Sequence, residues 1–500
     1  MAGYNAPARP GILAMTCPIR LPRLSRLAVL LALSALLAAA LACRDRRGAP
    51  REPPANTAAP RPLLGAARGW NLLLLSVDTI RADHLGAYGY AVRPTSPRMD
   101  ALLASGVRFE SAMSQRAATW PSLASVLTGL YPSAHGVTEN GYGFPDDLPT
   151  LPKLLHAAGY RTGAFLSNMC QANHQGWDGF ACSAGRDGKT VHRALEWAGQ
   201  PPGAGARPGA PFFLWVHLFG AHSPYYNGGD AAARVLDPGY QGMLGTKRWR
   251  LDPVMTRHLR LSPADVRHLD ALYDAAVMGS DRQVGALLDG LRAAGRLERT
   301  VVVLLSDHGE ELYAHNNYLY HSCSVYQTAL HVPLGIAAPG LLPAGAAVPQ
   351  TVELIDVAPT LLDLLAVAPP KEIHGRSLVP SLARPGAGGA GKPAFSQYGD
   401  APIATALAGG WKLVDNPRGY DPICIPNAPP HSYPIGREEL YDLSRDPGET
   451  TNLAAREPAR VAELQGLIRH RFASVVKRTG KQAVPDSLKE ELQALGYAAH

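Results

Sequence analysis

Two acidic positions stand just after short apolar runs, where a buried strand would end. Asp78 follows the run at 71–77, and Asp307, with His308 beside it, follows the Val-rich run at 300–305. The parallel strands of an open α/β sheet present such residues along one edge, where ligands bind. Either acid alone would be read as a turn or helix-capping residue. Together with the imidazole, the two carboxylates favour a site for a divalent cation.

A hydroxyl group stands at the predicted start of a helix over 119–129. Pro121 falls in the first turn, where its missing N–H costs nothing. The hydroxyl of Thr119 would lie among unpaired backbone N–H groups at the positive end of the helix dipole, which favours a bound anion and a developing oxyanion. Thr119 is therefore either a nucleophile or simply the N-cap of this helix.

The elements that would position these groups alternate along the chain. Buried strands are predicted at 71–77, 161–166, 212–218 and 300–305, and helices at 96–106, 119–129, 148–159 and 263–296. This alternation predicts an α/β fold, with a central, mostly parallel sheet sandwiched by helices. Beyond about 395 the pattern changes. Short antiparallel strands at 411–414 and 439–443 and a helix at 455–476 predict a small C-terminal α+β subdomain.

Two segments interrupt this rhythm. Residues 44–69 are rich in Arg, Pro and Ala and lack periodicity, which is typical of a tether. Residues 223–262 are predicted to form a long insertion near the active site, whose arginines would meet an anionic substrate or simply be solvated: Arg248, Arg250, Arg257 and Arg260. The expected organisation is a leader over 1–43, the tether, a catalytic domain over 70–394 and a C-terminal subdomain over 395–500.

The basic residues are concentrated near the N-terminus. Residues 1–68 hold ten arginines and two acidic residues, so the total charge of +7 leaves the other 432 residues at −1. The charge therefore gives no support for a nucleic-acid partner. A basic stretch followed by an apolar run at 27–42 predicts a secretory signal, with a membrane anchor helix as the alternative. Cys43 directly after it suggests a lipid anchor, and we expect export to the periplasm or cell surface. Export would also permit Cys170 and Cys182 to pair.

In their order and spacing, these stretches resemble the sulfatase-like branch of the alkaline phosphatase superfamily over about 70–500. The resemblance implies that Asp78, Asp307 and His308 bind one divalent metal ion together with the hydroxyl of Thr119, with Mn or Zn favoured over Ca because of the imidazole. It further implies that His222 and His321 face the substrate. The matching stretches are Ser76-Val-Asp-Thr-Ile-Arg-Ala-Asp-His-Leu-Gly86, Thr119-Trp-Pro-Ser-Leu-Ala-Ser-Val-Leu-Thr-Gly129, His217-Leu-Phe-Gly-Ala-His222, Ser306-Asp-His-Gly-Glu-Glu311, Asp356-Val-Ala-Pro-Thr360 and Glu439-Leu-Tyr-Asp-Leu443.

The chain departs from sulfatases at the nucleophile. Thr119 and Leu123 stand where sulfatases carry the Cys or Ser that becomes formylglycine and an Arg four residues later. Thr79 replaces a second Asp, and the stretch 165–168 replaces a Lys- and His-containing stretch that grips sulfate. These features resemble a Thr-nucleophile branch: lipoteichoic acid synthases, phosphoethanolamine transferases and nucleotide phosphodiesterases.

Three functions follow as expectations. The first is an exported, metal-dependent phosphate-ester hydrolase or phospho-group transferase that works through a phosphorylated Thr119. The second is a sulfuric ester hydrolase that uses Thr119 without formylglycine. The third is a non-catalytic binding protein, whose expected sign would be loss of the metal ligands. The substrate is expected to be a phosphate or sulfate ester that is either a small molecule or linked to a lipid or glycan.

Overall fold

The computed structural model describes residues 63–170, 175–201, 209–244, 260–315, 318–387, 389, 391–399, 402–419 and 435–478. Every described residue belongs to one compact unit within Pro60–His500. The predicted leader, Cys43 and most of the predicted tether lie outside the described residues. No helix in the described ranges is long and apolar enough to cross a membrane.

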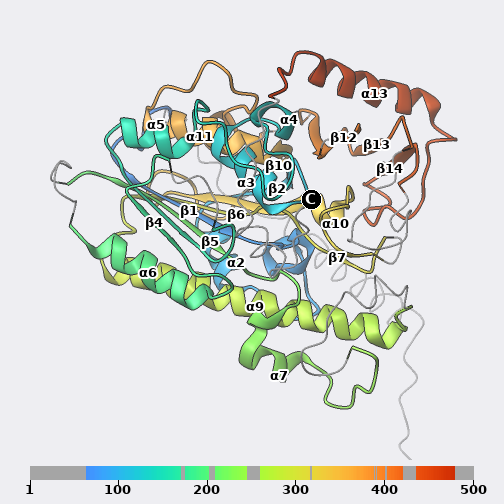
Figure 1. The fold of residues 1–500 in the computed structure, drawn as a ribbon, viewed down its shortest axis with the longest axis horizontal. Coiled ribbons are helices and arrows are strands. Elements are labelled where there is room, and N and C mark those ends of the chain that lie inside the picture. Colours follow the sequence, from blue (N-terminus) through green and yellow to red (C-terminus); the bar gives the residue numbers. More distant parts are fainter. Residues whose placement is uncertain are drawn as a thin grey trace, which may run out of the picture. The chain divides into compact units, whose positions relative to one another are not determined.

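The centre of the fold is an eight-stranded sheet in the order β10-β2-β9-β6-β1-β5-β3-β4 (Figure 1). All neighbouring pairs are parallel except those that β9 makes with β2 and β6. The predicted mostly parallel sheet is thus confirmed. Its strands are β1 (Asn71–Val77), β2 (Val107–Met113), β3 (Arg161–Leu166), β4 (Gly179–Cys182), β5 (Phe212–Leu218), β6 (Thr300–Ser306), β9 (His331–Ala337) and β10 (Ala346–Glu353).

Both faces of this sheet are covered by helices, which explains why the central strands are apolar throughout. In β1, Leu72 and Leu74 enter the core on one face, while Leu73, Leu75 and Val77 enter the core on the other. The first face is covered by α3 (Thr119–Thr128), α4 (Pro132–His135), α5 (Leu151–Ala157), α11 (Val357–Leu365) and α12 (Val379–Ala383). The second is covered by α2 (Pro97–Ala104), α6 (Asp187–Gly199) and α9 (Pro263–Ala293).

The C-terminal part forms a second, antiparallel sheet in the order β11-β12-β13-β14. Helix α13 packs on it through Val461, Leu464 and Ile468. β11 is tied to the segment that follows β2, because the Gln397 N–H donates to the Gln115 carbonyl at 2.8 Å. The predicted α+β arrangement is confirmed. The elements are β11 (Ala394–Tyr398), β12 (Ile403–Ala408), β13 (Trp411–Asp415), β14 (Glu438–Asp442) and α13 (Pro458–Ala473).

Short elements fill the connections at the edges of the sheet. In the predicted insertion, η3 and α7 pack against α9, while residues 245–259 lie outside the described residues. The last part of the predicted tether packs on α11, where the Gly65 N–H donates to the Asp363 carbonyl at 2.8 Å and Leu63 is buried. The short elements are η1 (Ala82–His84), η2 (Gly86–Tyr88), η3 (Tyr226–Ala231), η4 (Leu354–Asp356), α7 (Ala232–Val235), α10 (Gln327–Leu330), β7 (Glu311–Leu312) and β8 (Leu319–Tyr320).

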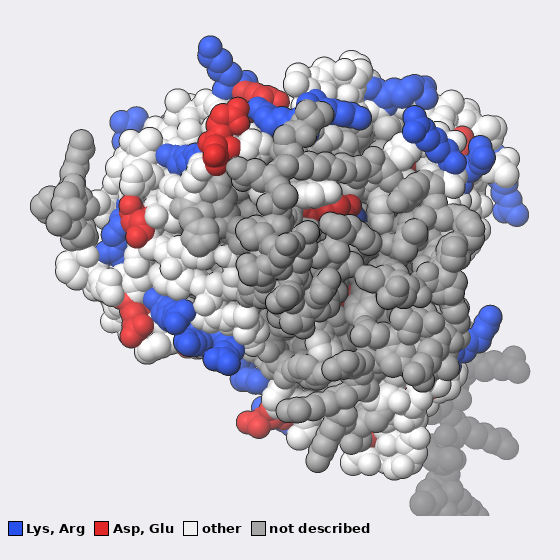
Figure 2. Space-filling view, in the orientation of Figure 1, with Lys and Arg blue, Asp and Glu red and all other residues white. Residues whose placement is uncertain are grey.

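The charged side chains on the described surface are mixed in sign. In the face drawn in Figure 2, blue basic and red acidic groups lie near one another along the margin. This distribution accords with the near-neutral charge of residues 69–500.

Candidate active site

The site is built at the carboxyl ends of β1 and β6, which are parallel neighbours in the sheet. Their register pairs Val77 with Ser306, so the residues that follow each strand lie side by side. Asp78 follows β1 directly, and Asp307 and His308 follow β6. All three side chains are completely buried. The strand ends therefore bring together the acidic groups that the sequence placed there.

The three side chains form a compact cluster of metal-ligand type. The His308 Nε2 atom lies 3.6 Å from Asp78 Oδ1 and 3.4 Å from Asp307 Oδ2. One ligand atom from each residue lies within 4.8 Å of the other two. His308 donates its Nδ1–H to the Gly309 carbonyl at 2.9 Å, so Nε2 carries the lone pair that faces the carboxylates. That is the tautomer a metal-ligating imidazole requires.

The electrostatics of this cluster fit a cation. Burial raises the pKa of Asp307 to about 7 and lowers the pKa of His308 well below its ordinary value. Asp307 Oδ1 accepts the Thr79 N–H at 3.3 Å, whereas the buried Oδ2 has no hydrogen-bond donor among the described residues. A buried carboxylate oxygen without a donor is costly unless a cation meets it. Two carboxylates and one imidazole form a suitable donor set for a divalent ion.

Thr119 is the first residue of α3, as predicted, and is completely buried. The N-cap alternative is wrong, because Ala118 occupies the cap position and Thr119 is the first helical residue. The Thr119 hydroxyl instead donates to His308 Nε2 at 3.3 Å. Ser122, one turn later, donates its hydroxyl to the Asp307 carbonyl at 2.7 Å, which fixes α3 against the end of β6. The structure thus brings the predicted nucleophile to the predicted metal ligands.

His321 lies beside His308 of the cluster, and His222 lies beside His321. The ring centroid of His321 is 4.3 Å from that of His308 and 5.0 Å from that of His222. His222 donates Nδ1–H to the Ser223 carbonyl at 2.6 Å, so Nε2 is the nitrogen that accepts protons. Burial lowers the pKa of His222 to about 4 and that of His321 to about 3. Both imidazoles are therefore neutral at pH 7 in the free protein, and a bound anion would favour their protonation.

Three polar residues at this site were not predicted. Glu310 is completely buried and accepts the His321 Nδ1–H at 3.3 Å, and burial raises its pKa to about 8. Asn140 accepts the Trp120 N–H at 2.8 Å and so lies at the start of α3. Arg116 donates to the carbonyl of Ser322, pairs with Glu139 at 3.1 Å and is 2% exposed. Glu310 follows the Asp-His pair in the sequence, but the pattern does not reveal where its carboxylate points.

Three other buried histidines contact polar groups of their own. His84 lies 2.8 Å from an oxygen of the buried Asp274, and His135 Nε2 lies 3.0 Å from the hydroxyl of Ser125. His217 Nε2 is 3.9 Å from Asp78 Oδ2, at the border of the cluster.

Of the arginines in the predicted insertion, which were expected to meet an anionic substrate or simply to be solvated, the structure describes one. Arg260 is exposed, and Arg248, Arg250 and Arg257 lie outside the described residues. From the stretch 165–168, Asn168 donates its side-chain amide to Asp78 Oδ2.

The fold is of the alkaline phosphatase-like class, and comparison with known proteins identifies one family within this class. The sequence profile of the sulfatase family matches residues 70–367. This chain belongs to the sulfatase family.

Known relatives cover most of the chain. An N-acetylglucosamine-6-O-sulfatase of Bacteroides thetaiotaomicron is 24% identical to it, over 77% of this chain and 82% of the relative. A protein solved in complex with its substrate D-glucosamine-2-N,6-O-disulfate has a TM-score of 0.66 at 21% identity and covers 81% of this chain and 98% of its own. A phosphonate monoester hydrolase of Agrobacterium radiobacter has a TM-score of 0.63 at 20% identity, and the match covers 83% of this chain and 97% of the hydrolase.

Proposed function

We propose that this chain is a metal-dependent sulfuric ester hydrolase that uses Thr119 as its nucleophile. The observation that carries the proposal is the hydrogen bond of 3.3 Å from the Thr119 hydroxyl to His308 Nε2, inside the cluster with Asp78 and Asp307, in a chain of the sulfatase family. The sulfatase relatives favour this reading over the phosphate-ester function that the sequence placed first. The retained ligand set also argues against the binding-protein alternative.

The first half of the reaction forms a covalent intermediate on the chain itself. The Thr119 Oγ1 attacks the sulfur, the Oγ1–S bond forms and the bond from sulfur to the leaving oxygen breaks. The proton from the Thr119 hydroxyl ends on the leaving oxygen, carried by Nε2 of His222 or His321. A divalent cation held by Asp78, Asp307, His308 and the Thr119 hydroxyl would lower the pKa of that hydroxyl and stabilise charge on the transferred group.

The second half must hydrolyse the intermediate at sulfur. Formylglycine hydrate carries a second hydroxyl that expels the sulfate, but Thr119 has only one. Water therefore attacks the sulfur of the Thr119 sulfate ester, the Oγ1–S bond breaks, and the hydroxyl of Thr119 regains its proton. His222 suits the role of proton acceptor for this water, because its Nδ1–H is held by the Ser223 carbonyl.

The proposed substrate is a sulfate ester on a small molecule or on a glycan. Two of the similar proteins support this choice: one is an N-acetylglucosamine-6-O-sulfatase, and the other was solved with D-glucosamine-2-N,6-O-disulfate as its substrate. We further propose that the enzyme is exported, on the basis of the basic and apolar stretch in residues 20–42.

A phosphorus ester is the second candidate. It is favoured by the similarity in fold to the phosphonate monoester hydrolase and by the single hydroxyl of Thr119, because phosphorus tolerates direct attack on a covalent intermediate well. The same active-site groups would serve, with phosphorus in place of sulfur.

A side-by-side assay separates these functions. p-Nitrophenyl sulfate, bis(p-nitrophenyl) phosphate and p-nitrophenyl phenylphosphonate would be tested with Mn²⁺, Zn²⁺, Ca²⁺ or EDTA. Thr119→Ala would be compared with Thr128→Ala, the same change at the other end of α3. We expect metal-dependent sulfate hydrolysis that is lost in Thr119→Ala and kept in Thr128→Ala. Dominant phosphorus-ester cleavage would favour the second candidate, and equal turnover by both variants would refute the role of Thr119.

A further inference from the structure

The two carboxylate oxygens of Asp78 have different neighbours. Its Oδ1 lies 3.6 Å from His308 Nε2, on the side of the metal-ligand cluster. Its Oδ2 accepts a hydrogen bond from the side-chain amide of Asn168. Both residues are completely buried. Because the amide of Asn168 holds one oxygen, it also determines which oxygen of Asp78 faces the metal-ligand cluster.

Asn168 lies just beyond the end of β3, and the backbone around it is held from two sides. The Ser167 N–H donates to the His217 carbonyl of β5 at 2.8 Å, and the Gly185 N–H donates to the Ser167 carbonyl at 2.6 Å. Cys182 Sγ lies 3.9 Å from the Asn168 carbonyl oxygen. The segment that presents the amide therefore depends on both a central strand and the edge of the sheet.

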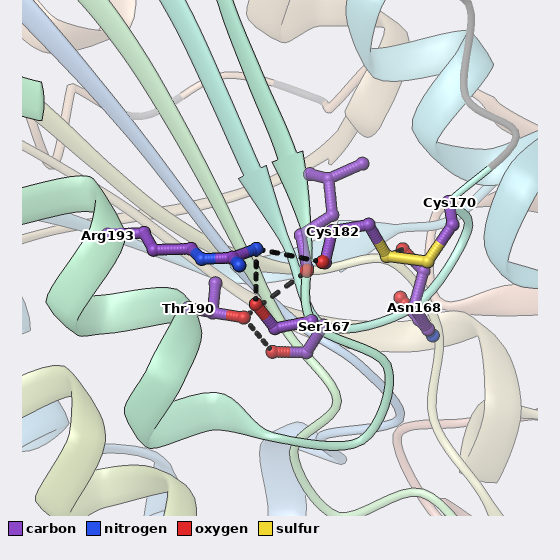
Figure 3. The surroundings of a disulfide bond; sticks show 8 residues. Ser167, Asn168, Cys170, Cys182, Thr190 and Arg193 are labelled. Carbon is purple, nitrogen blue, oxygen red and sulfur yellow. Dashed lines mark hydrogen bonds between the residues drawn. A yellow bond between two sulfur atoms is a disulfide. The ribbon is translucent and has the colours of Figure 1, made fainter.

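That edge is closed by a covalent bond. Cys170, two residues after Asn168, is joined by a disulfide to Cys182, the last residue of β4 (Figure 3). The bond confirms the pairing that the sequence permitted. Strand β4 is an edge strand that pairs only with β3 among the described strands. Both cysteines are partly exposed, so a reductant in solution can reach them.

Helix α6 supports the same edge independently of the disulfide. Figure 3 shows Arg193 and Thr190 reaching towards the ends of β4 and β3. Arg193 donates to the Cys182 carbonyl at 3.2 Å, and the hydroxyl of Ser167 donates to that of Thr190 at 2.9 Å. We therefore expect loss of the disulfide to loosen the segment around Asn168 without unfolding the sheet.

We propose that Asn168 is a positioning residue for Asp78 and that the Cys170–Cys182 disulfide holds it in place, so that the metal affinity of the site depends on the oxidised state of these cysteines. The inference rests on the proposed function in taking Asp78 as a metal ligand. Partners that orient a ligating side chain contribute about 10–100-fold to metal affinity. Reduction by a dithiol breaks the S–S bond, leaves a thiol on each cysteine and converts the dithiol to a cyclic disulfide.

The test measures binding of Mn²⁺ alone to the full chain by isothermal titration calorimetry. Mn²⁺ prefers oxygen ligands, so newly formed thiols compete little for it. Three variants are compared with the oxidised wild type: Asn168→Leu, Cys170→Ala/Cys182→Ala and the triple combination. The matched control is dithiothreitol treatment of the Cys170→Ala/Cys182→Ala variant, which lacks this disulfide. The treatment should leave the Mn²⁺ affinity of this variant unchanged, whereas it should weaken Mn²⁺ binding by the wild type. Circular dichroism of each variant checks that the fold is kept.

The expected result is a Kd raised about 10-fold or more by Asn168→Leu and several-fold by the cysteine pair. If the disulfide acts through Asn168, the triple variant binds no more weakly than Asn168→Leu, because coupled changes are not additive. Equal Kd values in wild type and Asn168→Leu, or fully additive effects, would overturn the inference. If Asn168→Leu fails to fold, the inference would be overturned by dithiothreitol-treated wild type that binds Mn²⁺ as tightly as the oxidised protein does. A wild type that binds no divalent ion would instead refute the proposed function.

Discussion

Glu353 at the end of β10 makes the stability of the fold depend on pH. Its side chain is buried where the two sheets meet, and it accepts the Tyr131 hydroxyl at 2.8 Å and the Phe395 N–H of β11 at 2.9 Å. Burial, followed by the charge of Asp356, raises its pKa from 4.5 to about 8. The free energy of unfolding of the wild type should fall as pH rises, and we predict that Glu353→Gln makes this fall much smaller. Glutamine can accept the same two hydrogen bonds without a charge.

The sign and size of this effect follow from the shifted pKa. Between the ordinary pKa and about 8 the folded state binds more protons than the unfolded state, so the free energy of unfolding falls as pH rises through this window. Each pH unit is equivalent to about 1.4 kcal/mol, so the loss between about pH 5 and about pH 7.5 is ~3 kcal/mol. The pKa of Asp356 moves in the same direction, to about 6, chiefly through burial, and adds to the slope.

Urea unfolding of wild type and Glu353→Gln across this pH range is the assay. The control is Glu298→Gln, the same change at an exposed position. The wild type and the control should lose stability with rising pH, while Glu353→Gln should show a much flatter profile and exceed the wild type above neutrality. Parallel profiles for all three proteins would refute the reasoning, since they would show that Glu353 is ionised in the folded state at little cost.

Three further predictions concern the site and its support. Asp307→Ala should raise the Kd for Mn²⁺ by more than about 100-fold, because it removes a ligand rather than an orienting partner; EDTA should lower the melting temperature of wild type but not of this variant. Gly309→Ala should destabilise the fold by about 2 kcal/mol or more in urea unfolding, because a Cβ would lie 2.0 Å from the Thr328 carbonyl oxygen. The control Gly466→Ala in α13, where a Cβ would meet nothing within 4 Å, should stabilise the fold by about 0.5–1 kcal/mol. Thr119→Ser should keep a hydroxyl and hence turnover, measured as kcat, while Thr119→Ala should lose about three orders of magnitude or more.

The strands that position the site could be predicted because they are buried on both faces. β1, β5 and β6 are apolar runs with polar residues only at or near their ends, and the predicted bounds of these three strands and of β3 hold to within one residue. β2 was missed because Arg108 and Glu110 interrupt its apolar residues. β9 and β10 were missed because each contains a proline, Pro333 and Pro349, in a position that argues against a sheet strand. Their pairing depends on tertiary contacts that a local pattern does not contain.

Site residues could be predicted only where they stand at the end of a predicted strand or at the start of a predicted helix. Asp78 and Asp307 follow strands, and Thr119 begins a helix, so each location follows from its element. The roles of Asn168, Glu310 and Arg116 depend on which way a side chain turns in a loop. The hydrophobic periodicity of the sequence does not indicate which way a loop side chain turns, so these contacts become visible only in the structure.

The most direct test of the account is the chemical state of Thr119 during turnover. The His222→Ala variant, in which hydrolysis of the intermediate should slow, would be mixed with p-nitrophenyl sulfate and Mn²⁺, quenched in acid and digested for peptide mass mapping. The peptide containing Thr119 should be heavier by one sulfuryl group, and the modification should map to the Thr119 hydroxyl. An unmodified Thr119 in that peptide, together with metal-dependent turnover that survives Thr119→Ala, would contradict it.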